Sequence, residues 1–177
     1  MHKSISQFLT FLNNRKLFFI GITLSIIFMF SDLYSKFYAF SFLNNLISDG
    51  IIQYPSLEIT SFFNLVQVWN RGVSFGMLND LTHGKLIIIC LNLTISSILV
   101  VWLFKNKHPY LTLSLSFIIG GALGNLIDRI MNNAVADFLD FHIMGYHWPA
   151  FNLADSFVFI GVAMLLLENL FIKKDEK

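Results

Sequence analysis

Four long apolar segments follow one another along the chain, at about 17–40, 86–104, 111–130 and 154–172. Each approaches the roughly 20 apolar residues that an α-helix needs to cross about 30 Å of hydrocarbon. A cleaved secretory signal is a poor interpretation of the first segment, because no small-x-small cleavage site follows it and three further spans do. The pattern predicts an all-α membrane protein with four transmembrane helices in a single integral membrane domain, 1–177.

The segment between the first two spans, about 41–85, is expected to form a small β-sheet outside the membrane. Polar and apolar residues largely alternate from Ile59 to Trp69, which is typical of a strand. Asn70-Arg71-Gly72 suits a turn, and Val73-Ser74-Phe75 suits a returning strand. The second connecting segment, 131–153, is compatible with either a short strand or a helix.

The composition supports a membrane protein and excludes several other classes. Hydrophobic residues make up 55% of the chain and charged residues only 13%, with a mean hydropathy of +0.66, whereas about 25% of an ordinary soluble domain is charged. The net charge of +1 with no basic stripe argues against a nucleic-acid partner. A single cysteine, Cys90, excludes an internal disulfide framework and a cysteine-based zinc site.

The distribution of Lys and Arg predicts the orientation in the membrane. Eight of the twelve basic residues lie before the first span, between the second and third spans, or after the fourth. Short cytoplasmic loops retain positive charge, so both termini are expected in the cytoplasm. The segments at about 41–85 and 131–153 would then face outward.

Polar residues concentrate near the outer ends of the predicted spans and between them, and the cytoplasmic halves are nearly bare apart from Glu168. Because a charged group at mid-bilayer costs on the order of 3 kcal/mol, such groups normally line a cavity or pair. The distribution predicts a polar cleft that opens towards the outer leaflet. Within it, Asp32 and Lys36 are four residues apart and can pair on one helix face, although an interfacial anchor with a snorkelling lysine is an equal alternative. Gly120 and Gly124 suit close helix packing.

Asp137 and Asp155 are the candidates for chemistry. Each follows small or apolar residues at the mouth of the predicted cleft, and the short return between the third and fourth spans can bring them together. Two adjacent carboxylates share one proton and can act as acid and base, as in aspartic proteases. The alternative is a helix cap and a surface acid. His142 and His147 lack the spacing of a metal site and are expected at the membrane interface.

Five motifs, in order and at sensible spacing, resemble the lipoprotein signal peptidase (signal peptidase II) family over about residues 20–170. They are Asp32-x-x-x-Lys36, Asn70-Arg71-Gly72-Val73-Ser74-Phe75 after Phe63-Asn64-Leu65, Gly121-Ala122-Leu123-Gly124-Asn125-Leu126-Ile127-Asp128-Arg129, Val135-Ala136-Asp137-Phe138, and Phe151-Asn152-Leu153-Ala154-Asp155-Ser156. Each motif alone would be weak, but the set on a four-span plan is highly specific. Departures from the family pattern are small, at Ser35, Val73-Ser74 and Ala136, and leave the two aspartates in place.

The resemblance implies an aspartic endopeptidase of the bacterial cytoplasmic (inner) membrane, with its active site facing the periplasmic side. Members of the family remove the signal peptide of prolipoproteins just before a cysteine that carries diacylglycerol. By resemblance, Asp137 and Asp155 are catalytic, and which is base and which is acid stays open. Supporting or substrate-binding residues would be Asp32, Lys36, Asn64, Asn70, Asn125, Arg129 and Asn152. Asp128 is expected to be structural, paired with a basic neighbour. The partners would be prolipoprotein signal peptides and membrane lipid, with no metal or organic cofactor, and a monomer is expected.

The main alternative is a transport or proton-conducting membrane protein without enzymatic activity, because intramembrane acids and an Asp/Lys pair also suit a proton path. A path of that kind needs polar groups through the full depth of the membrane. The inner halves of the spans offer only Glu168, Thr94 and a few serines. A packing subunit of a larger complex would not require two acids placed beside Asn125 and Asn152. The distribution argues against a proton path, and the set of motifs favours the peptidase.

Overall fold

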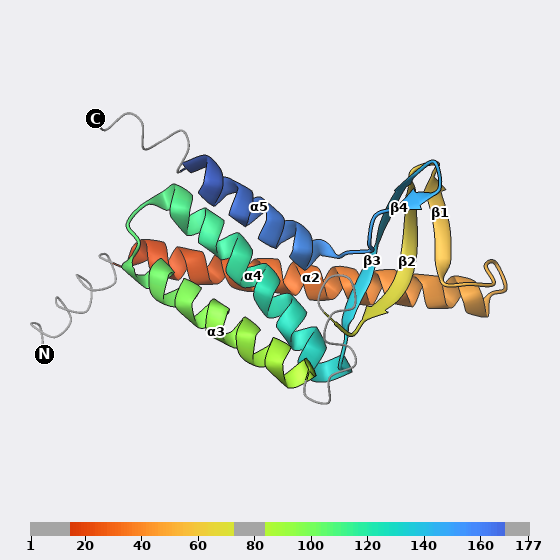
Figure 1. Ribbon diagram of the computed structural model, residues 1–177, viewed down its shortest axis with the longest axis horizontal. Helices are drawn as coiled ribbons and strands as arrows, with labels where there is room; N and C mark the ends of the chain where they lie inside the picture. The colour runs from red at the N-terminus through yellow and green to blue at the C-terminus, as the bar shows by residue number, and fades with distance from the viewer. Residues whose placement is uncertain (1–14, 73–83, 169–177) are drawn as a thin grey trace, which may run out of the picture.

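The computed structural model describes residues 15–72 and 84–168 of the chain. In this described part of the chain four helices run alternately up and down side by side, and a small sheet lies across one end of the bundle (Figure 1). The elements in chain order are α2 (Lys16–Ser48), β1 (Ser56–Thr60), β2 (Phe63–Asn70), α3 (Gly84–Lys105), α4 (Pro109–Asn132), β3 (Val135–Ile143), β4 (Tyr146–His147) and α5 (Leu153–Leu167).

The apolar segments of the sequence correspond to these helices. Within the described residues, α2, α3 and α4 are long and apolar enough to cross a membrane. The fourth helix, α5, has 15 described residues and begins where the fourth span was expected. The predicted end of that span, beyond Glu168, lies outside the described residues. The helices expose large apolar side chains outward, for example Phe30, Leu91 and Phe159, as lipid-facing helices do.

Helix α4 lies at the centre of the bundle and contacts the other three helices. Its glycines allow close approach, as the sequence predicts: a Cβ at Gly120 would lie 2.7 Å from the Cβ of Phe28 on α2, and one at Gly121 would meet the carbonyl of Ala154 on α5. Phe117 of α4 packs against Phe28 and against a ring of α5. The small residues and the stacked rings therefore fix α2, α4 and α5 against one another.

Helix α2 continues well beyond the predicted end at Phe40. Its 33 residues correspond to about 50 Å, which exceeds the roughly 30 Å of hydrocarbon. The extension is stabilised by packing rather than by local sequence: Ala39 and Phe40 form an apolar cluster with Ala136 and Phe138 of β3, and Leu43 is fully buried. The sheet therefore rests on the outer part of α2 (Figure 1).

The sheet is antiparallel, in the order β1-β2-β3-β4. The prediction that it lies wholly between the first two spans is wrong, because β3 and β4 come from the segment at 131–153, which is therefore extended rather than helical. The single strand expected from Ile59 to Trp69 is divided between β1 and β2. The expected turn at Asn70-Arg71-Gly72 begins where β2 ends, and the N–H of Gly72 donates to Oδ1 of Asn70 (3.2 Å). Strand β2 reaches Asn70, and the β1–β2 turn falls at Ser61 and Phe62. The expected return strand at Val73-Ser74-Phe75 lies outside the described residues.

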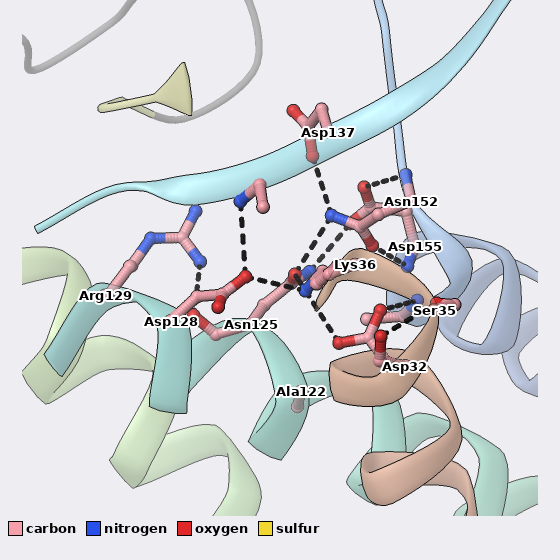
Figure 2. A network of polar contacts seen from close by, with 12 residues as sticks. Asp32, Ser35, Lys36, Ala122, Asn125, Asp128, Arg129, Asp137, Asn152 and Asp155 are labelled. Carbon is pink, nitrogen blue, oxygen red and sulfur yellow. Dashed lines mark hydrogen bonds and ion pairs between the residues drawn. The ribbon is translucent and has the colours of Figure 1, made fainter. Parts of the chain in front are cut away.

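Strand pairing places residues of the two outer segments together. Strand β2 pairs with β3 so that Asn70 lies opposite Val135 and Val68 opposite Asp137. The register shifts between Leu65 and Val68, as at a β-bulge, which re-aims side chains locally. Asp137 is thereby held on a strand directly above the ends of α4 and α5 (Figure 2).

Candidate active site

A buried lysine links two helices at the end of the bundle next to the sheet. Lys36 is 3% exposed, and its Nζ lies 2.6 Å from Asp32 of its own helix and 2.9 Å from Asp128 of α4. The same nitrogen donates a hydrogen bond to Oδ1 of Asn125 (2.9 Å). The Asp32–Lys36 pair expected from the sequence is therefore present, and Lys36 is the basic neighbour expected for Asp128.

Both carboxylates of this ion cluster also accept a hydrogen bond from a backbone N–H group of another element. Asp32, which is fully buried, accepts a hydrogen bond from the N–H of Ala154 at the start of α5 (2.8 Å). Asp128 accepts one from the N–H of Ala136 on β3 (3.2 Å). Because ionised acceptors roughly double the strength of a hydrogen bond, these contacts fix α5 and β3 relative to α2 and α4.

Asn152 forms the N-cap of α5 and connects the two candidate aspartates. Its Oδ1 accepts from the backbone N–H of Asp155 (2.9 Å), and Asp155 Oδ2 accepts from the backbone N–H of Asn152, which completes a capping box. Its Nδ2 donates to Oδ1 of Asp137 (2.6 Å) and to Oδ1 of Asn125 (3.1 Å). Figure 2 shows this amide between the strand that carries Asp137 and the helix that carries Asp155.

The two aspartates differ in their surroundings. Asp137 is 2% exposed and accepts from Asn152 and from Nδ2 of Asn70 (3.1 Å). Burial, reinforced by the nearby charge of Asp155, raises the pKa of Asp137 from 3.8 to about 6. Asp155 is half-buried, and its Oδ1 accepts from Nδ2 of Asn125 (2.8 Å).

Arg129 supplies positive charge next to the pair. It interacts electrostatically with Asp155 and, less strongly, with Asp137. Its guanidinium donates to the carbonyl oxygens of Asn125 (3.3 Å) and Gly72 (3.4 Å), which orients it along the end of α4 beneath β3 (Figure 2).

The structure thus brings together eight of the nine site residues expected from the sequence. Asn64 lies elsewhere: its Nδ2 donates to Asp140 (2.8 Å). Asp140 and Asp137 are three residues apart on β3, so their side chains point to opposite faces of the strand.

The Asn64 contact belongs to a group that the sequence interpretation missed. Nδ1 of His147 lies 2.9 Å from both carboxylate oxygens of Asp140, whereas His147 was expected only at the membrane interface. Burial opposes the ionisation of Asp140, but hydrogen bonds from His147 and Asn64 outweigh it and hold the pKa of Asp140 below its ordinary value. The Asp140–His147 contact depends on the hairpin between β3 and β4, in which Ile143 pairs with Tyr146 and His142 lies opposite His147. A hairpin predicted at this place in the sequence would have indicated the contact.

Two carboxylates linked through the amides of Asn152 and Asn125, one of them inclined to keep its proton, suit general acid–base chemistry on a polar bond. The two aspartates come from β3 and α5, so the site exists only when the sheet and the bundle are assembled. Within residues 15–72 and 84–168 there is no cluster of three His, Cys, Asp or Glu side chains that could hold a metal ion.

The chain is similar to proteins of one family over most of its length. The family model described as signal peptidase (SPase) II matches residues 12–171. A lipoprotein signal peptidase of Aeromonas hydrophila is 47% identical over 119 residues, or 66% of this chain and 71% of that protein. One from Francisella tularensis subsp. mediasiatica is 41% identical over 156 residues, or 85% and 91%.

Two solved structures are also similar to this chain in fold. A structure described as a bacterial membrane enzyme, determined by the in meso method at 2.3 Å resolution, aligns with a TM-score of 0.71 and 27% identity over 89% of this chain and 92% of that one. A second, at 1.9 Å resolution, aligns with a TM-score of 0.69 over 86% and 93%. With the family model covering nearly the whole chain and the arrangement of acids described above, the chain belongs to the signal peptidase II family of aspartic proteases.

Proposed function

We propose that this multi-pass membrane protease cuts diacylglyceryl-modified prolipoproteins on the amino-terminal side of the lipidated cysteine, with Asp137 and Asp155 as its catalytic pair. The observation that carries the assignment of the pair is the position of Asn152, whose amide contacts both residues at once. The names of the relatives, lipoprotein signal peptidases, supply the substrate class. Family membership also favours a peptidase over the transport or proton-conducting alternative.

The surroundings of the two acids favour a division of roles. Asp137 keeps its proton to a higher pH because it is buried beside another acid, so it is the proton donor. Asp155 is more exposed and interacts more strongly than Asp137 with the positive charge of Arg129. Asp155 is therefore the base. The assignment follows the general rule that two acids whose environments differ take up different tasks.

The reaction then proceeds in two steps. Asp155 removes a proton from water, the hydroxide adds to the scissile carbonyl carbon, and Asp137 gives its proton to the carbonyl oxygen. In the second step the C–N bond breaks, the proton on Asp155 passes to the departing cysteine nitrogen, and Asp137 recovers a proton as the carbonyl re-forms. Both acids end in their starting states, and no other reactant is consumed.

The orientation inferred from the sequence agrees with where this chemistry is needed. The start of α2 at Lys16 and the connection from Lys105 to α4, which contains Lys107, lie at the opposite end of the bundle from β3 and the start of α5 (Figure 1). Positive charge marks the cytoplasmic side, so the acids face the periplasmic side of the inner membrane. A lipidated cysteine is anchored in the outer leaflet at that depth. The chain brings both acids to one site, which supports function as a monomer.

The test is a cleavage assay with purified protein in detergent. A diacylglyceryl-modified prolipoprotein and its unlipidated form are incubated with wild type, Asp137→Asn and Asp155→Asn, and the products are separated by gel mobility. We expect cleavage of the lipidated form only, and a loss of at least about 10³-fold in each variant, since each removes a group that transfers a proton.

Asp49→Asn is the matched control, because Asp49 is an exposed acid at the end of α2 on the same side. It should cleave at the wild-type rate. Cleavage by a folded Asp137→Asn or Asp155→Asn variant at more than a few per cent of the wild-type rate would remove that residue from the pair. Equal cleavage of the unlipidated form would contradict the proposed substrate class.

A further inference from the structure

A cavity of about 310 Å³ lies at the end of the bundle opposite the sheet, where α2 begins and α3 passes into α4. Figure 1 shows this end on the left, far from the acids of β3 and α5. The charged residues of the lining are all basic: Arg15, Lys16 and Lys107. The rest of the lining comes from Leu17, Asn106 and the rings of Phe18 and Phe104.

Arg15 is held in place rather than extended into solvent. Its Nη1 donates to the carbonyl oxygen of Phe104 (2.8 Å), and its guanidinium carbon lies 3.9 Å from the centre of the Phe104 ring. The Phe18 ring packs edge-on against Phe104 with centroids 5.3 Å apart. A guanidinium has five N–H donors, so a fixed Arg15 can bind a phosphate group with those that point away from the carbonyl.

An apolar groove adjoins the cavity along α2. It has a volume of about 460 Å³ and is lined by Lys16, Phe19, Ile20, Thr23 and Leu24. These positions follow the i, i+3, i+4, i+7, i+8 spacing of a single helix face and span about 12 Å along the axis. Lys16 lines both spaces, so a charged hollow and an apolar groove meet at one side chain.

We propose that these two spaces form a binding site for one anionic phospholipid of the leaflet at that end of the bundle. The phosphate lies among Arg15, Lys16 and Lys107, and an acyl chain follows the groove towards Thr23 and Leu24. The proposal does not depend on the catalytic assignment, because no residue of this site contacts the acids.

The chemistry of the lining selects this occupant. The three positive charges around the cavity repel one another, and a bound phosphate with net negative charge offsets that repulsion. Basic pockets between membrane helices at the cytoplasmic side bind anionic head groups in this way. A zwitterionic lipid carries its own cation and gains less. A free phosphate ion would use the hollow and leave the groove unused.

The experiment measures binding to the full-length purified protein by microscale thermophoresis. The probes are dioctanoyl-phosphatidylglycerol, dioctanoyl-phosphatidylcholine and inorganic phosphate. We expect the phosphatidylglycerol Kd of the Lys16→Gln/Lys107→Gln variant to rise about tenfold or more, since the charge-assisted contacts of two cations are lost. Thr23→Trp, which fills the exposed groove, should weaken phosphatidylglycerol binding and leave phosphate binding unchanged.

Lys105→Gln is the matched control, because Lys105 ends α3 at the same face of the bundle but does not line the cavity. Its Kd should stay within about twofold of wild type. An equal loss in Lys105→Gln would mean a diffuse surface attraction and overturn the site. Phosphatidylcholine bound as tightly as phosphatidylglycerol would overturn the anionic selectivity. Phosphate bound as tightly as phosphatidylglycerol, or a Thr23→Trp variant with unchanged lipid affinity, would overturn the role of the groove.

Discussion

Replacement of Asp137 by Asn should make the protein more stable at neutral pH while it abolishes cleavage. Burial beside Asp155 raises the pKa of Asp137 from 3.8 to about 6. The folded state therefore binds a proton that the unfolded state has already released between these pH values, so the free energy of unfolding falls as the pH rises through this range. Each unit of difference in pKa between the folded and unfolded states corresponds to about 1.4 kcal/mol. Full ionisation of Asp137 therefore lowers the free energy of unfolding by roughly 3 kcal/mol.

Asparagine removes this cost and introduces a smaller one. Asp137 accepts hydrogen bonds from Nδ2 of Asn152 and Nδ2 of Asn70, and an amide in its place offers only one acceptor oxygen. One bond is lost, at about 1 kcal/mol. The variant should thus exceed wild type by about 2 kcal/mol above pH 7 and fall below it by about 1 kcal/mol below pH 4, with a change of sign between.

The measurement is denaturant unfolding in detergent micelles, followed by Trp fluorescence at several pH values from 4 to 7.5, with the midpoint converted to a free energy through the slope. Asp49→Asn serves as the control, since it removes an exposed acid from the same end of the molecule. A difference between Asp137→Asn and wild type that does not change with pH would refute the reasoning. So would a difference that falls as the pH rises.

Three further changes test the supports of the site. Lys36→Met leaves Asp32 and Asp128 facing each other without their cation, and should lower the free energy of unfolding by about 3–5 kcal/mol; a loss under 1 kcal/mol in denaturant unfolding would contradict the buried ion cluster. Asn152→Ala removes the cap of α5 and should cost about 1–2 kcal/mol in the same measurement, together with most of the cleavage activity; normal kcat would show that its amide does not organise the acids. Gly121→Val forces α4 away from α5 and should cost about 1–3 kcal/mol by overpacking, whereas an unchanged thermal midpoint would exclude the close helix contact.

Hydropathy predicted the helices well because crossing a bilayer imposes a length and a composition that can be read residue by residue. It ended the first helix at Phe40, since the residues that follow become more polar. Tertiary packing decides the true end: Leu43 is fully buried, and the sheet covers the outer part of α2. The composition of the residues after Phe40 does not by itself indicate this packing contact.

The sheet was harder to predict for a similar reason. The alternation from Ile59 to Trp69 predicted one strand, yet the β1–β2 turn falls at Ser61 and Phe62. Strand β2 then pairs with β3, more than 60 residues later in the chain. The pairing of strands distant in sequence is set by the apolar faces that they bury on α2 and not by turn residues. The Asp140–His147 contact was missed with it, because it depends on the β3–β4 hairpin.

The site residues were easier to find than the strands that carry them, since a membrane protein places few polar groups and places them where they are used. What the sequence left open was the direction of the hydrogen bonds among them. Lys36 can only donate, so it orients Asn125 with the amide oxygen towards the ammonium and the amide nitrogen towards Asp155.

That orientation has a consequence for the two acids. Asn125 must donate to Asp155, and the backbone N–H of Asn152 donates to the other oxygen of the same carboxylate. Each oxygen of the Asp155 carboxylate therefore has a donor, and these two hydrogen bonds fix its orientation. Asp137 also has two amide donors, but burial, reinforced by the nearby charge of Asp155, raises the pKa of Asp137 to about 6. The buried ion cluster at Lys36 therefore does more than hold four elements together: through the amide of Asn125 it also orients the carboxylate of Asp155, the residue that we propose as the base.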